Sequence, residues 1–242
     1  MSGLANGDVE ECEAGAALSF LLWFAAEAPD TATVETAVGR GFRRVDGAIH
    51  GTMPHAKVII ELAAIGEGAP AHLMAIERAA FDHAQALSLV ALVQSEECEM
   101  VDLVKELSRF ALDLASIEGC IAVGWVPAGS GMDAAYFRTV VGQWLDGGAF
   151  PALGLTVLEQ TSDGDLQSRG LAILTGQEIC VTTSDGLDDV DRAKVAIRMI
   201  DHIVRNGAIT GAEMLEVDGF GQFWAQPDEN KQKINIRKKP NP

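Results

Sequence analysis

Short apolar runs alternate with amphipathic stretches along this chain, and the alternation predicts a mixed α+β protein. Continuous apolar runs are typical of strands that are buried on both faces. Such runs occupy 18–25 (LSFLLWFA), 57–65 (KVIIELAAI) and 87–93 (LSLVALV). Between them the pattern predicts a short helix at 31–38, a strand of mixed polarity at 42–49 and a short helix at 72–81.

The stretch 119–146 organises the centre of the chain. An apolar strand at 121–126 ends at Pro127, because proline lacks the N–H that a continuing ladder needs. Ser130 is placed to cap a following helix, which Gly147 ends. Three- and four-residue spacing gives that helix an apolar face of Phe137, Val140, Val141 and Trp144. Since 153–158 reads as a strand, the unit is strand, helix, strand.

Two long amphipathic helices are predicted at 96–115, with Ser95 as the cap, and at 188–206. Strand-rich segments at 155–160 and 169–183 are separated by TSDGDLQS, whose Asp163-Gly164 pair indicates an antiparallel hairpin. Short closing strands follow at 215–217 and 222–225. The basic tail from Lys231 is expected to be loose or to form an edge strand.

The two halves of the chain show the same order of elements. LLWF, Pro29, a helix and glycine are echoed by VGWV, Pro127, a helix and Gly147. We therefore predict an α+β protein of pseudo-duplicated ferredoxin-like βαββαβ units with a largely antiparallel sheet. The predicted regions are a disordered acidic N-terminus (1–14), a first half (15–116), a second half (117–228) and a basic tail (229–242).

Charge narrows the classes of partner. The chain has 242 residues and a formal net charge of -17, which disfavours nucleic acid and anionic membranes as main partners and fits a basic partner protein. Alternatively, the acidity serves only solubility. The apolar stretch 14–28 follows acidic rather than basic residues, and it is shorter than the ~20 residues of a membrane-spanning helix. We expect a cytoplasmic protein.

Residue types that carry chemistry are present, but without the spacing of known motifs. The four cysteines (Cys12, Cys98, Cys120, Cys180) lack a CxxC pair and are expected to be reduced core thiols. The five histidines (His50, His55, His72, His83, His202) lack metal-binding spacing. No metal site, cofactor or catalytic residue is predicted.

Two places remain as candidates for ligand binding. In the turn Gly129-Ser130-Gly131, exposed backbone N–H groups would suit an anion. The G-x-S-x-G spacing of a nucleophile is absent, so the simpler interpretation of Ser130 is a helix cap. Glu178 would be a raised-pKa carboxylate if it points inward, whereas strand alternation favours a half-exposed side chain partnered by Lys or Arg. Together with Trp125, these residues would surround a site between the two halves.

Four segments resemble the DUF4261 family of bacterial proteins of unknown function. They are AVGWVPAGSG with its helix, LAILTGQEICV, VDGFGQF and FDHAQALSLV. The resemblance covers most of residues 17–226, and it implies a fold and a bacterial origin. It brings no catalytic residues, and GQE stands here where the family more usually has proline before glutamate.

The function expected from the sequence is a non-enzymatic protein-interaction module with an acidic surface. The alternative is a small-ligand-binding protein or hydrolase-like enzyme with a site between the two halves. A homodimer joined through exposed strand edges is compatible with either hypothesis.

Overall fold

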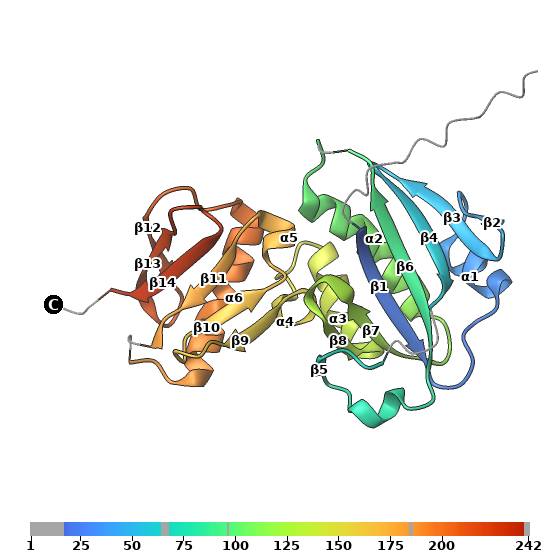
Figure 1. Cartoon of the computed structure of the whole chain (residues 1–242), viewed down its shortest axis with the longest axis horizontal. Helices are drawn as coiled ribbons and strands as arrows, with labels where there is room; N and C mark the ends of the chain where they lie inside the picture. Colours follow the sequence, from blue (N-terminus) through green and yellow to red (C-terminus); the bar gives the residue numbers. More distant parts are fainter. Residues whose placement is uncertain (1–16, 64–67, 96, 184–185, 240–242) are drawn as a thin grey trace, which may run out of the picture.

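The computed structural model describes residues 17–63, 68–95, 97–183 and 186–239. The predicted N-terminal region 1–14 and Cys12 lie outside these residues. Figure 1 shows two lobes side by side, each built on an open sheet. Both sheets are mostly antiparallel, with one parallel pair in each, so the α+β class is confirmed.

The first lobe contains an eight-stranded sheet in the order β2-β3-β4-β6-β1-β7-β8-β5. Its strands are β1 (Ala17–Phe24), β2 (Arg43–Val45), β3 (Ala48–Met53), β4 (Ala56–Leu62), β5 (His72–Met74), β6 (Gln85–Val93), β7 (Cys120–Trp125) and β8 (Ser130–Asp133). Its helices are α1 (Thr31–Val38), α2 (Met100–Ala115), α3 (Ala134–Leu145) and the 3₁₀ turns η1 (Arg78–Phe81) and η2 (Val126–Ala128).

The second lobe contains a six-stranded sheet in the order β12-β13-β14-β11-β10-β9. Its strands are β9 (Val157–Gln160), β10 (Leu166–Arg169), β11 (Glu178–Val181), β12 (Glu213–Val217), β13 (Gly221–Pro227) and β14 (Lys233–Lys238). Its helices are α4 (Ala152–Leu155), α5 (Ala172–Thr175) and α6 (Asp189–Asn206).

Several predicted elements are confirmed because their local signals are strong. The apolar run of β1 is a central strand between β6 and β7. Asp188 caps α6 by accepting from the Asp191 N–H at 2.7 Å, and Gly207 ends that helix. The Asp163-Gly164 turn joins β9 to β10 in an antiparallel hairpin.

Other expected elements were wrong in position or type. The predicted helix at 72–81 is β5 followed by η1, and the strand at 42–49 is a hairpin of β2 and β3 with a turn at Asp46-Gly47. Part of the strand predicted at 153–158 is the short helix α4, and α5 interrupts the strand predicted at 169–183. The hydrophobic runs there are buried at the lobe junction, where a single helical turn packs as well as a strand does.

Two caps and the tail also differ from expectation. Ser95 does not cap α2, which begins after Glu99, and Ser130 lies at the start of β8, while Asp133 caps α3 through the Tyr136 N–H at 2.9 Å. The expected loose or edge tail forms β14, which lies between β13 and β11 inside the second sheet. The region boundary expected after residue 116 lies between α2 and β7. Because β7 pairs with β1, the first sheet continues beyond that boundary.

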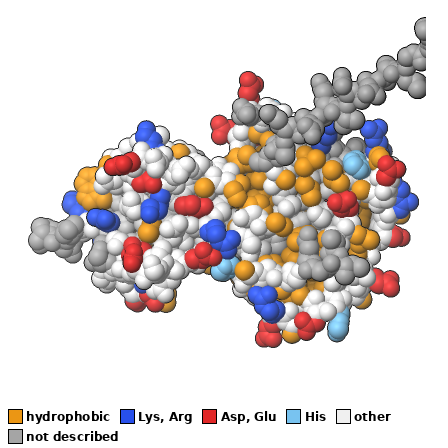
Figure 2. Space-filling model, viewed as in Figure 1, with side chains coloured by type: hydrophobic (Ala, Val, Ile, Leu, Met, Phe, Trp, Pro, Cys, Tyr) orange, Lys and Arg blue, Asp and Glu red, His pale blue; other side chains and the backbone are white. Residues whose placement is uncertain are grey.

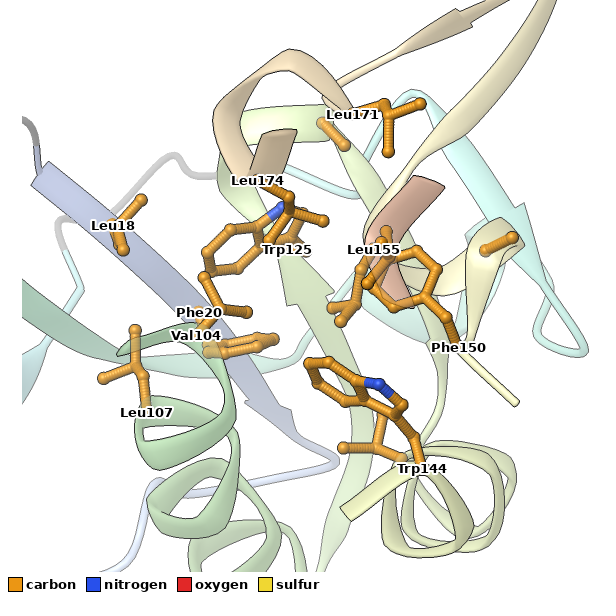
Figure 3. Close-up of a cluster of buried hydrophobic side chains, with 14 of the residues drawn as sticks. Leu18, Phe20, Val104, Leu107, Trp125, Trp144, Phe150, Leu155, Leu171 and Leu174 are labelled. Atoms are coloured by element: carbon orange, nitrogen blue, oxygen red, sulfur yellow. The ribbon is translucent and has the colours of Figure 1, made fainter. Parts of the chain in front are cut away.

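One hydrophobic core runs through both lobes. Its residues come from β1, α2 and α3 of the first lobe and from α4, α5 and α6 of the second. Figure 3 shows Leu174 of α5 beside Trp125, with Phe150 and Leu155 near Trp144. Phe20 packs against Trp125 with ring centroids 4.7 Å apart. The lobes therefore share buried apolar contacts at their junction.

Candidate functional site

Polar residues from both lobes meet beside the η2–β8 turn. His72 of β5 lies with its Nε2 atom 3.0 Å from Glu159 Oε1 of β9. Arg169 of β10 donates to the same carboxylate from Nε, at 3.0 Å. We call His72, Glu159 and Arg169 the junction cluster.

The charge of Glu159 is stabilised by this arrangement. Its hydrogen bond from Arg169 lowers the pKa of the carboxyl group, and the nearby Arg169 and His72 charges act in the same direction against a smaller effect of burial. The three side chains are about two-fifths exposed. The cluster is thus a solvated ion pair with a histidine at its edge, which links β5 of one lobe to β9 and β10 of the other.

The backbone beside the cluster requires glycine at two points. Gly129 is left-handed, with φ of 64°, and a Cβ atom there would lie 3.4 Å from the Arg169 guanidinium. Gly170 has φ of 92°, and a Cβ atom there would meet the Ala128 side chain at 2.7 Å. The loops of the two lobes therefore approach each other closely at this turn.

The turn residues expected to bind an anion lie against neighbouring protein groups. The Ser130 side chain is buried, and its hydroxyl donates to the Gly154 carbonyl at 2.5 Å. A Cβ atom on Gly131 would meet Pro70 at 2.6 Å. Trp125 is 1% exposed in the shared core. Ser130 and Trp125 thus contribute to the contact between the lobes, and ligand binding at these residues stays a prediction.

Glu178 points to the same junction but has a structural set of partners. Its Oε1 atom accepts from the backbone N–H groups of Gly170 and Ala172, at 2.8 and 3.0 Å, and its Oε2 atom accepts from the Ser168 hydroxyl. The expectation that Lys or Arg would partner Glu178 is wrong. The carboxylate instead accepts hydrogen bonds from backbone N–H groups at the start of the single turn of α5.

A small pocket and an open groove are lined by residues outside the junction cluster. The pocket has a volume of about 240 Å³ at the junction and is lined mainly by apolar residues, among them Met74, Tyr136 and Phe150. The groove, of about 690 Å³, runs between α1 and the end of α2 and includes Asp30, Asp113 and Glu118. Burial raises the pKa of Asp113, whereas the hydrogen bonds from Thr33 lower the pKa of Asp30.

An apolar surface lies on the first sheet, on the face opposite the helices. Residues that alternate with the core positions point there, and Leu21, Ile59 and Val90 are only partly buried while Leu92 is 38% exposed. Figure 2 shows this apolar area spread over the first lobe. The outer face is defined here by Ser19 and Leu21 of β1, Lys57, Ile59 and Glu61 of β4, and Ser88, Val90 and Leu92 of β6.

One end of that surface is covered. Phe81 of η1 packs on Trp23 and Ala122, with Leu73 and Ile76 around them. This second hydrophobic cluster covers the β1–β7 end and leaves the β4–β6 end open among the described residues. Figure 1 shows α1 and α2 behind the sheet, on the side away from this surface.

Comparison of the chain with models of protein families, with curated proteins and with solved structures finds no match. The DUF4261 resemblance therefore stays a prediction. In the described part of the chain, no group of three or more His, Cys, Asp or Glu residues is arranged to hold a metal ion. Within the same ranges, no helix is long and apolar enough to cross a membrane.

The cysteines in the described ranges are free thiols. Cys180 is buried, whereas Cys98 and Cys120 are partly buried. Burial raises the pKa of Cys120 to about 12, and it raises the pKa of Cys180 as well. Such thiols hold little thiolate at neutral pH and are poor nucleophiles.

Sequence reasoning missed the junction cluster and the outer face. Glu159 and Arg169 lie at paired positions 157–160 and 166–169 of one hairpin, so the Asp163-Gly164 turn could have placed them near each other. The approach of His72 required the parallel pairing of β5 with β8, for which there was no local signal. The outer face could have been found from the apolar residues at every second position of β1 and β6.

Proposed function

We propose that this protein is a protein-interaction module and that the outer face is its contact surface. The observation that carries the proposal is a sheet face that presents Leu21, Ile59, Val90 and Leu92 and has no net charge, within a chain whose formal net charge is -17. Among the residues that define the face, Lys57 and Glu61 are the charged ones, and their charges cancel.

The composition of the face is unusual for a surface in contact with water. An antiparallel sheet with helices on one side ordinarily alternates apolar residues toward the core with polar residues toward solvent. On β6 this alternation fails, because Val90 and Leu92 point outward while Leu89 and Ala91 fill the core. Exposed apolar patches of this kind are typical of protein contact sites.

The order of strands in the first sheet supports the same surface. We propose that β1, α1, β4, β6, α2 and β7 form a ferredoxin-like unit, for which the antiparallel order β4-β6-β1-β7 is support. Such a unit places both helices on one side of its sheet and leaves the other side for a partner. The duplication expected in the second half stays a prediction, since the second sheet has a different strand order.

The test is capture of partners from a native extract by the purified full chain, with Val90→Lys as the disrupting variant. Lysine in the centre of the face would place an unpaired charge in the contact. Val190→Lys is the matched control, because Val190 is 62% exposed on α6 in the other lobe. Circular dichroism of each variant checks that it is folded.

We expect a protein that binds to the native chain and to Val190→Lys but not to Val90→Lys, and that remains bound at high salt. Retention by Val90→Lys would overturn the assignment of the face. If the native chain and both variants lose their partner at high salt, the result would instead favour the basic partner expected from the net charge. The acidic groove of Asp30, Asp113 and Glu118 would then be its contact.

A small ligand at the lobe junction is a second candidate, favoured by the convergence of His72, Glu159 and Arg169 and by a separate junction pocket of about 240 Å³ that other residues line. That volume is below the ~300 Å³ at which drug-sized sites begin. A thermal-shift screen of small carboxylates and phosphates against the native chain and Arg169→Gln tests it. Stabilisation of the native chain alone supports this candidate, and equal or absent shifts contradict it.

A further inference from the structure

We infer that the partner of the outer face is a second copy of this chain, packed face to face about a two-fold axis through Ile59. This inference rests on the proposed function and adds the identity of the partner. It is carried by the positions of the two charges on the face and by the charge of the molecule around it.

Lys57, Ile59 and Glu61 are alternate residues, so all three point out of the same face. Ile59 is opposite Val90 of β6, and Val90 is opposite Ser19 of β1. One row of uncharged side chains thus crosses the face, with Lys57 on one side of it and Glu61 on the other.

Two identical sheet faces can meet about a two-fold axis that lies in the plane of contact and runs across the strands. If the axis follows the row through Ile59 and Val90, each copy reverses the strand direction of the other. Ile59 then packs on the same residue of the second copy, and Lys57 faces the second copy's glutamate at position 61. The face is therefore complementary to itself in charge.

The charge of the whole molecule opposes association of two copies. Two chains that each carry -17 repel each other over most of their surfaces. The outer face adds no net charge to this repulsion, because the charges of Lys57 and Glu61 cancel. Neither side chain has an ion-pair partner among the described residues, since the pairs found there involve other residues.

The size of the surface is suited to a weak dimer. The three strands β1, β4 and β6, spaced by about 4.8 Å and with about seven residues each at 3.3 Å, cover on the order of 330 Å² in projection. Interfaces of this class bury less than about 1,200 Å² in total and are commonly transient. Edge-to-edge pairing, which the sequence also suggested, is less suited to the first sheet, because its edge strands β2 and β5 have three residues each.

The test is sedimentation velocity of the purified full chain over a dilution series, with charge-swap variants. Lys57→Glu and Glu61→Lys each place like charges opposite one another at two symmetry-related contacts. We expect each variant to raise the dimer dissociation constant by about tenfold, given two exposed pairs of ordinary strength. The double variant Lys57→Glu/Glu61→Lys restores opposite charges and should restore the native constant.

Matched controls separate the local contact from the net charge. Glu61→Lys makes the chain less acidic, so general repulsion predicts tighter association for it, whereas the face-to-face contact predicts weaker association. Glu216→Lys on β12 and Lys194→Glu on α6 change the net charge equally but lie on the second lobe. We expect both controls to retain the dimer.

Two outcomes overturn the inference. One is a native chain that remains monomeric at every concentration, and the other is a dimer for which the double variant is as weak as the single variants. If the chain is monomeric but still captures another protein through Val90, only the identity of the partner as a second copy is contradicted. The proposed function then remains. A monomeric chain that dimerises after removal of residues 1–16 would show that the chain's own N-terminal segment occupies the face.

Discussion

Ser130 shows how a residue with a functional sequence context can be structural. Its position between two glycines after a strand suggested a cap or an anion site, yet the buried hydroxyl donates to Gly154 across the lobe junction. Contacts between residues 24 positions apart have no local sequence signal. Asp188, by contrast, was recognisable as a cap because its partner is three residues away.

Replacement of Ser130 tests this role. Ser130→Ala leaves the Gly154 carbonyl without its buried donor, which should lower the free energy of unfolding by about 1–3 kcal/mol. Chemical denaturation measures the change. Ser116→Ala is the control, because Ser116 is an exposed serine at the end of α2 and should change stability by less than about 0.5 kcal/mol. An unchanged stability in Ser130→Ala would contradict the structural role.

Glu159 gives the junction a pH dependence. Its pKa is lowered from 4.5, so the carboxylate stabilises the folded state above that value, and the contribution is lost as the pH falls through the lower folded-state pKa. Since the pair is two-fifths exposed, we expect Glu159→Gln to cost about 0.2–1 kcal/mol at neutral pH. The difference from the native chain should vanish in acid.

Thermal unfolding of both proteins between neutral and acidic pH measures this difference. Glu216→Gln, at an exposed position of β12, is the control and should follow the native chain at every pH. A Glu159→Gln penalty that persists or grows in acid would contradict the ion pair as its cause.

At the scale of elements, the sequence predicted what depends on local pattern. The amphipathic period identified α6, and Asp163-Gly164 identified a hairpin. The Asp46-Gly47 pair carried the same signal for β2 and β3. The parallel pairing of β14 with β11 joins residues more than fifty positions apart, so no local pattern indicated a partner for the basic tail.

The tail strand should accordingly be essential for the second lobe. Ile236 is fully buried on β14, and Ile236→Ala is expected to lower the free energy of unfolding by about 2–5 kcal/mol. The neighbouring Arg237 is exposed, so Arg237→Ala serves as the control and should change stability by less than about 0.5 kcal/mol. Urea denaturation measures both variants. Equal stability of the two would mean that the tail is not part of the core.

At the scale of the whole molecule, the lobes share a hydrophobic core, and the first sheet has an outer face with exposed apolar residues and no net charge. Charge and composition predicted an acidic globular protein, and α+β class followed from the alternation of elements. Charge and composition could not show which surface has no net charge, because that depends on which strands lie side by side. The sheet order brings Ile59, Val90 and Leu21 onto one surface.

The central claim is that this surface contacts another protein, and site-specific photo-crosslinking tests it most directly. A benzophenone amino acid replaces Val90 on the outer face or, as the control, the more exposed Val190 on α6. The full chain is then irradiated alone and in native extract. We predict a defined adduct from position 90 and none of the same mass from position 190. No adduct at position 90, or the same adduct from both positions, would contradict the claim.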